Sequence, residues 1–391
     1  MNREIMRENP MMNKFLIFIL LPLIFLTGCW DLNENERMYY AFGAGVDFKD
    51  GQYEVTIQII SFSRVAKTEQ FNQDVIQSQV TSATGNTIDE AFFELYHAID
   101  ERVFWGHFSL LIFSEGVLKQ GAFDSVVNTI TRFSDTRYRT WIYCTDEPLD
   151  QFLLALPLLK KSITLSKIGD PLNSYEQESF IQPIDLRNLI INLNEPSHEA
   201  NIPYIKLRED WKTQKEPLSS IEFDGIGVVT PKEFKGFIKD DKANGLQWMS
   251  NKTIRAEITT SYEKDKYFSA ILRNVNVNIV PIVKGNDVRF DINVGLTASL
   301  GSFEGDLTSD KIKELVKQTV KKEIEQTYQA ALEMNADVFR LSEILYREDL
   351  KKWKEIQKDG RIELGEDSIR NINININKLT SGRKSFRDTI E

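Results

Sequence analysis

Few residues in this chain are of the types that usually carry nucleophilic, redox or metal chemistry. There are two cysteines and three histidines among 391 residues. The patterns of a phosphate-binding loop, a zinc protease helix and a redox Cys-x-x-Cys pair do not occur in the sequence. What remains is the thiol of Cys29, which follows an apolar run and could accept an acyl group. We therefore expect no metal, no cofactor and no enzymatic activity.

The N-terminal residues indicate how Cys29 would be used. A basic leader is followed by the twelve-residue apolar run 15–26, which is shorter than the roughly 20 residues that a spanning helix requires. The run ends in Leu26-Thr27-Gly28-Cys29, which resembles the lipobox of bacterial lipoproteins. In that class a signal peptidase recognises the three residues before the cysteine, cuts there, and the thiol carries a diacylglycerol. The alternative is an ordinary signal peptide with an incidental cysteine.

This interpretation assigns residues 1–28 to a lipoprotein signal peptide and Cys29 to lipidation, with Leu26, Thr27 and Gly28 as the signal-peptidase recognition residues. Stable membrane attachment needs more than one acyl chain, and a lipidated N-terminus provides that. The body would then be held by lipid alone, on the side of the membrane away from the cytoplasm. Cys144 lies in a strand-like run and is expected to be a buried apolar residue.

The composition and the remaining candidate residues limit the ligands and partners that the chain could bind. The chain carries 48 Lys and Arg against 58 Asp and Glu, a net charge of −10, whereas phosphate backbones require a basic face. Nucleic acid is therefore excluded as a partner. His107 heads a buried strand and is expected to be a hydrogen-bonded structural histidine. A short acidic segment at 240–245 resembles the start of a calcium loop, but Lys242 occupies a ligand position and Asn251 stands where a bidentate Glu is required, so we reject a calcium site.

Strands and helices alternate in the first part of the body, which predicts an N-terminal α/β-type domain over 29–200. The hairpin signal Asp50-Gly51 follows a strand that contains Gly43 and Gly45, which we interpret as a bulge or a close backbone approach. Thr87 is the expected N-cap of a helix. The expected strands are 39–48, 53–59, 107–118 and 137–146, and the expected helices are 88–102, 121–133, 147–159 and 185–195.

Shorter strands follow a loop with two prolines, and they predict a small β-rich middle domain over 201–262. They are 203–207, 219–230, 235–240 and 245–250. The remainder, 263–391, is predicted to be a C-terminal α+β domain with an antiparallel-rich sheet. Its long amphipathic helix starts near Ser309 and extends to about residue 335, a second helix covers 338–358, and an Asn/Ile-alternating strand covers 371–377. The fold class is α+β, with three domains of mixed sheets and packed helices in a lipid-anchored ectodomain.

The order of several short motifs resembles the C-subunit lipoproteins of bacterial spore-germination nutrient receptors, the GerC family. The N-terminal matches are Cys29-Trp30-Asp31, then Gly43, Gly45 and Asp47, then Tyr53, Val55, Thr56 and Gln58. Further matches are Gly85 and Thr87, His107 to Phe113, Arg132, Ile221 to Gly225, Phe234 to Gly236, Ala336 to Phe339, Trp353 and the terminal strand. Met38-Tyr39-Tyr40 is bulkier than the usual stretch, and 161–215 matches poorly.

The resemblance implies a non-enzymatic subunit without a cofactor. It implies assembly with two integral-membrane receptor subunits, of A and B type, at the outer surface of the spore inner membrane, and a role in the response to nutrient germinants. No germinant-binding residue can be assigned. The alternative is a solute-binding lipoprotein of a transporter, which would have two similar lobes. A cell-envelope hydrolase is disfavoured because metal and triad motifs do not occur.

Overall fold

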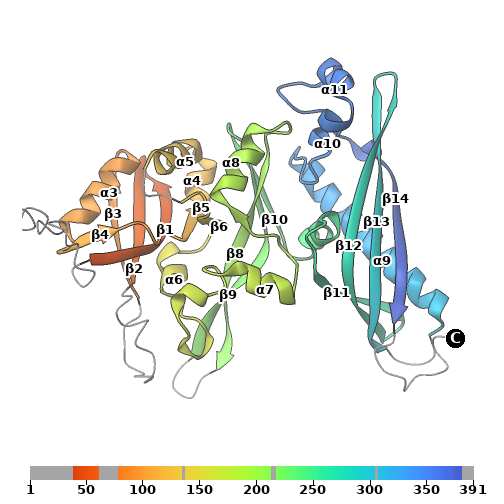
Figure 1. Ribbon diagram of the computed structural model, residues 1–391, viewed down its shortest axis with the longest axis horizontal. Coiled ribbons are helices and arrows are strands. Elements are labelled where there is room, and N and C mark those ends of the chain that lie inside the picture. Colours follow the sequence, from red (N-terminus) through yellow and green to blue (C-terminus); the bar gives the residue numbers. More distant parts are fainter. Residues whose placement is uncertain (1–37, 61–77, 134–136, 213–216, 304–306, 381–391) are drawn as a thin grey trace, which may run out of the picture. The chain divides into compact units, whose positions relative to one another are not determined.

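The structure is a computed structural model that describes residues 38–60, 78–133, 137–212, 217–303 and 307–380. The lipidation site Cys29 and its recognition residues Leu26, Thr27 and Gly28 lie outside the described residues. Two sheets and several helices make up the described chain, which confirms the predicted α+β class (Figure 1).

The larger sheet has ten strands. Its main path runs β10-β9-β8-β6-β5-β1-β2-β3, with β4 paired to β1 and β7 paired to β6. The pairs β1/β5, β5/β6 and β6/β8 are parallel, and the flanking pairs are antiparallel. The strands are β1 Met38–Lys49, β2 Gln52–Ile60, β3 Ser78–Gly85, β4 Arg102–Phe104, β5 Leu110–Ser114, β6 Trp141–Thr145, β7 Ile184–Asp185, β8 Ala200–Lys212, β9 Pro217–Val229 and β10 Phe234–Lys239.

Helices pack on both faces of this sheet. Ala44 of β1 lies in the core that contains the apolar sides of α3, α5 and α8, whereas the next residue, Gly45, contacts Leu149 of α6. Consecutive strand residues point to opposite faces, so α6 covers the other side. The helices are α3 Ile88–His97, α4 Glu115–Lys119, α5 Phe123–Arg132, α6 Leu149–Leu154, α7 Pro171–Gln177 and α8 Leu186–Asn194, with 3-10 turns η2 Leu158–Lys160 and η3 Ile163–Leu165.

The smaller sheet has the order β11-β12-β13-β14. The first three strands form antiparallel pairs, and β14 lies parallel to β13, so the sheet is antiparallel-rich as predicted. The long helix α9 packs on it, with ten buried residues on one stripe. The elements are β11 Arg255–Glu263, β12 Lys266–Lys284, β13 Asp287–Phe303, α9 Ser309–Glu333, α10 Leu341–Glu348, α11 Leu350–Ile356, η5 Glu366–Ser368 and β14 Ile369–Thr380.

Two predicted elements of the second half differ in the structure. The single helix expected over 338–358 is two helices, because Asp349 leaves the helical conformation and its side chain caps α11 by accepting from Lys352 N at 2.9 Å. The strand expected at 245–250 is part of the 3-10 segment η4 Asp240–Met249. That segment packs on α9, where Thr327 Oγ1 accepts from the backbone N–H of Gly245 at 2.9 Å.

The strands expected between 203 and 240 form, as β8, β9 and β10, but they extend the same sheet as the N-terminal strands. The domain boundary expected between residues 200 and 201 falls at the start of β8, and the sheet continues across it. The division into 29–200, 201–262 and 263–391 stays a prediction.

Candidate functional site

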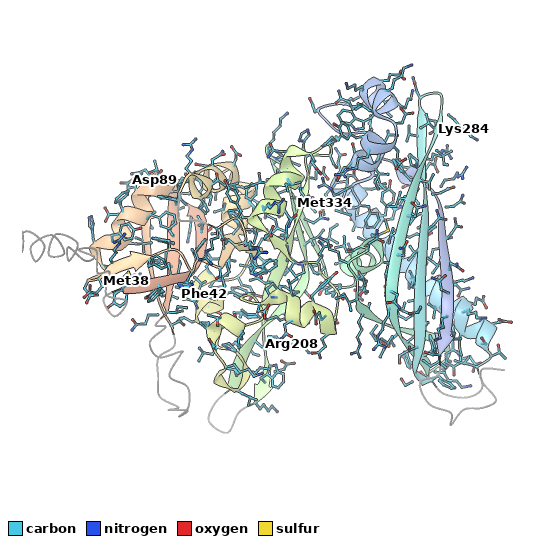
Figure 2. The ribbon with its side chains drawn as sticks, in the orientation of Figure 1. Met38, Phe42, Asp89, Arg208, Lys284 and Met334 are labelled. Carbon is cyan, nitrogen blue, oxygen red and sulfur yellow. The ribbon has the colours of Figure 1, made fainter. Side chains whose placement is uncertain are left out.

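A group of polar and charged side chains, three of them buried, joins the two sheet regions, and we call it the Glu199 junction. Its members are Ser197, Glu199, Asp337, Arg340 and Arg361. The first two lie just before β8 of the large sheet, and the other three surround the connections that follow α9 and α11. Figure 2 labels Met334, which immediately follows α9 next to this junction.

The carboxylate of Asp337 organises the start of α10. It accepts hydrogen bonds from the backbone N–H groups of Leu341 and Ser342, both at 2.8 Å, and from Ser197 Oγ at 3.0 Å. The first N–H groups of a helix have no partner within the helix, so a carboxylate placed there satisfies them. Burial raises the pKa of Asp337 above its usual range. Asp337 therefore fixes α10 while it binds the segment that leads into β8.

Glu199 is only 2% exposed, and its carboxylate faces groups from the C-terminal region. It accepts a hydrogen bond from the backbone N–H of Asp337 and pairs with Arg361 Nη1 at 3.0 Å. Burial, with the charge of Asp337, raises its pKa to about 7, whereas the Asp337 N–H and Arg361 oppose that shift. A carboxyl group with its pKa raised to about 7 gains or loses a proton around neutral pH. The charge of the junction therefore depends on pH in this range.

Further hydrogen bonds surround the junction. Arg340 Nη1 donates to the Glu199 carbonyl at 2.7 Å, and Asn201 Nδ2 donates to the Val338 carbonyl at 2.9 Å. The backbone N–H of Ser197 donates to the Gly360 carbonyl at 3.0 Å. These polar contacts join the two sheet regions beside an apolar core, in which Ile226 and Ile238 of the large sheet pack in one cluster with residues of the small sheet and α9. Hydrogen bonds depend on geometry more strictly than apolar contacts do.

A second, half-buried acid lies on α9. Burial raises the pKa of Glu323 to about 7, and its carboxylate accepts from Trp248 Nε1 of η4. Glu323 lines a cavity of about 460 Å³ together with Asp240, Asp241 and Glu257. Despite these carboxylates, no group of His, Cys, Asp or Glu side chains with metal-binding geometry occurs in the described part of the chain.

The N-terminal motif formed by Gly43, Gly45 and Asp47 has a packing role in the structure. A Cβ at Gly43 would lie 2.6 Å from Leu110 Cδ1, and a Cβ at Gly45 would lie 3.0 Å from Leu149, so both positions are close approaches, as expected. The pairing of β1 with β2 also shifts register between Ala41 and Gly43. Asp47 accepts hydrogen bonds from Ser114 Oγ and from the backbone N–H of Phe48, which joins β1 to the start of α4.

The other residues singled out from the sequence are structural. Cys144 is fully buried, burial raises its pKa, and its Sγ lies 3.4 Å from the Ile202 carbonyl oxygen, which confirms the prediction of a buried cysteine. The ring of His107 packs against Tyr40 and Phe104, and burial lowers its pKa. The sequence does not predict the Glu199 junction: Asp337 lies in the motif Ala336 to Phe339, and Glu199 lies in the loop expected between the helix 185–195 and the strand 203–207.

Comparison with known proteins covers nearly all of the chain after residue 30. Residues 31–207 match the family model described as "Spore germination protein N-terminal domain", and residues 224–380 match "Spore germination B3/ GerAC like, C-terminal". Spore germination protein KC of Bacillus subtilis is 23% identical over 87% of this chain and 89% of its own length. Spore germination protein B3 of the same organism is 23% identical over 70% of each chain.

A solved structure shares the fold. The crystal structure of the GerBC protein aligns with a TM-score of 0.52 at 14% identity, over 87% of this chain and 97% of that chain. In the part of the chain that the structure describes, no helix is both long and apolar enough to cross a membrane.

Proposed function

Because the chain belongs to the GerC family of spore germination proteins, we propose that it is a non-enzymatic lipoprotein subunit of a germinant receptor complex. In this proposal it is required for the response to nutrient germinants. It assembles with two integral-membrane subunits, of A and B type, and is held by lipid at Cys29 on the outer surface of the spore inner membrane.

The extent of the family match carries this proposal. The two family models together span residues 31–380 with a short gap, so both sheet regions take part in the resemblance. The buried titratable groups described above support a structural role, because each is engaged by packing or by hydrogen bonds between elements. A protein that acts through contact needs such a rigid scaffold and no reacting group.

Deletion of the gene tests the proposed function. We expect spores without the gene to lose or strongly reduce germination with the nutrient that their receptor serves, and the intact gene in trans to restore it. Germination by added dipicolinate with calcium, a route that bypasses nutrient receptors, serves as the control for spore viability. Unchanged nutrient germination with every candidate nutrient would refute the role.

The proposed anchor has a matched control within the chain. Cys29→Ala removes the acyl acceptor, so the protein is expected to disappear from washed membranes. Cys144→Ala changes the other cysteine, which is buried in the core, and should leave membrane association intact. Retention of the Cys29→Ala variant in washed membranes would refute lipid anchoring without touching the family assignment.

A further inference from the structure

Exposed aromatic side chains gather around the start of β1, and we call them the aromatic edge. They are Tyr39, Phe93, Tyr96, Phe104 and Phe133. Phe93 is 65% exposed, the highest value of any large aromatic residue that the structure describes. Within the described residues, every strongly exposed phenylalanine belongs to this group. Figure 2 marks the location by Met38 at the start of β1 and Asp89 in the first turn of α3.

The members on α3 and α5 are connected through ring contacts. The rings of Phe93 and Tyr96 lie 5.9 Å apart, and Tyr96 OH accepts from Trp105 Nε1 at 3.1 Å. Trp105 packs on Phe92 at 5.5 Å, and Phe92 packs on Phe133 at 6.0 Å. Ring contacts, partly through the buried Phe92, therefore link side chains from three separate segments.

The other members join this surface to β1. The strand β4, which contains Phe104, pairs with β1. The ring of Phe104 lies 5.8 Å from that of Tyr40, the neighbour of Tyr39. The hydroxyl of Tyr39 donates to Asp100 Oδ1 at 2.9 Å, just after α3. The aromatic edge thus surrounds the point at which the chain enters the sheet.

Exposed aromatic surface of this extent needs a partner, since apolar patches are rare on surfaces that face only water. The charge around it is mixed: acidic Asp89, Glu90 and Glu94 lie on α3, and basic Arg102 and Arg132 lie next to Phe104 and Phe133. Mixed charge does not favour attraction to an anionic surface. Tyrosine side chains, which have a polar tip, are enriched at the boundary between lipid tails and headgroups, and Tyr39 and Tyr96 are of this type. The three phenylalanines of the edge add apolar surface.

The length of the chain between Cys29 and β1 indicates which surface covers the aromatic edge. Eight residues lie between Cys29 and Met38, and this stretch spans at most about 30 Å when it is fully extended. A lipid at Cys29 would therefore keep the start of β1 within that distance of the bilayer, at a high effective concentration. We propose that the aromatic edge inserts into the headgroup region of the membrane that carries the lipid anchor. This inference rests on the proposed anchoring and adds a second contact, which orients the body.

A spin label tests the insertion directly. Acylated full-length protein with Phe93→Cys is labelled with a nitroxide and reconstituted into vesicles of phosphatidylethanolamine and phosphatidylglycerol. Native Cys144 is buried, and Cys29 is acylated, so the label goes to position 93. We expect the label to become more accessible to oxygen and less accessible to a water-soluble nickel reagent than it is in detergent-free buffer. Lys284→Cys, in the hairpin between β12 and β13, is the matched control and should remain accessible to nickel.

Two further measurements separate the possible failures. Replacing Phe104 and Phe133 by serine should return the label at position 93 toward the aqueous value, while the protein still floats with the vesicles. High salt should change the accessibility of the label at position 93 only slightly. Flotation with an aqueous label at position 93 would overturn the insertion and leave the proposed function standing. Failure to float would contradict the anchor and the insertion together. If the label at position 93 is protected from nickel only in native membranes that contain the receptor subunits, the aromatic edge contacts a protein partner, and the lipid contact is overturned.

Discussion

The two sheets of this protein are covered in different ways. The ten-stranded sheet has helices on both faces, and the central strand β5 is buried along its whole length. The four-stranded sheet packs one face on α9, and its other face presents polar side chains such as Asn293 and Asn373, which share a hydrogen bond at 3.0 Å. A strand buried on both sides tolerates change poorly everywhere, whereas a strand buried on one side should tolerate change at every second residue.

The largest effect is expected where backbones meet in the large sheet. A Cβ at Gly225 of β9 would lie 2.0 Å from the Ile238 carbonyl oxygen of β10, so Gly225→Val must displace backbone. We expect it to lower the free energy of unfolding by at least about 4 kcal/mol, measured by urea denaturation. Gly285→Ala in the hairpin of the small sheet has nothing within 4 Å and should cost only about 1 kcal/mol for its positive φ. Equal losses of unfolding free energy in the two variants would contradict the expected difference between the two sheets.

The next effect concerns the junction between the regions. Arg361→Met leaves buried Glu199 without its cation, so we expect a loss of about 3 kcal/mol at pH 8. The pKa of Glu199 is raised to about 7 in the folded protein, against 4.5 in the unfolded chain. The folded state therefore binds the proton more tightly, and the stabilisation it gains is complete below pH 4.5 and is lost as pH rises through 7. The cost of Arg361→Met should accordingly shrink at pH 5.5. A cost that is independent of pH would show that Glu199 does not titrate in this range.

A smaller effect should separate neighbouring residues of β14. Ile374 is buried against α9, and Ile374→Ala should cost about 2 kcal/mol. Asn373 points to the polar face, and Asn373→Ala should cost less than about 0.5 kcal/mol. Urea denaturation of both variants under one condition is the measurement. A large loss at Asn373 would mean that the polar face is covered in the protein as it exists in solution.

The loss of a helix cap is expected to have the same modest effect in both regions. Thr87 caps α3 by accepting from Glu90 N, and Thr308 caps α9 by accepting from Lys311 N. Replacing either threonine by alanine removes one hydrogen bond and should cost about 1 kcal/mol. A much larger loss at one position would show that its helix end has a role beyond capping, such as a contact with a partner.

Elements with a clear period could be predicted from the sequence. Residues at helical spacing from Ile312 to Leu332 predicted α9 almost to its ends, and alternation predicted β14. The Asp50-Gly51 turn and the Thr87 cap were also predicted correctly, because each depends on local chemistry alone. Residues 245–250 were predicted wrongly because a short apolar run has no reliable period, and its conformation is set by packing on α9.

The Glu199 junction could not be predicted in the same way. Its carboxylate meets Asp337 and Arg361, which lie 138 and 162 residues further along the chain. Pairing over such distances follows from tertiary structure and leaves no local pattern. The break between α10 and α11 had a local signal, since Asp349 followed by a helical segment is a typical N-cap, and that signal was overlooked.

Co-purification from spore membranes tests the proposed receptor role most directly. The full-length chain with an affinity tag at its C-terminus is isolated from detergent-solubilised inner membranes of dormant spores. We expect two integral-membrane proteins to co-purify in constant ratio, and we expect Cys29→Ala to abolish their recovery while Cys144→Ala retains it. Recovery of the intact, acylated chain without membrane partners would contradict its role as a receptor subunit.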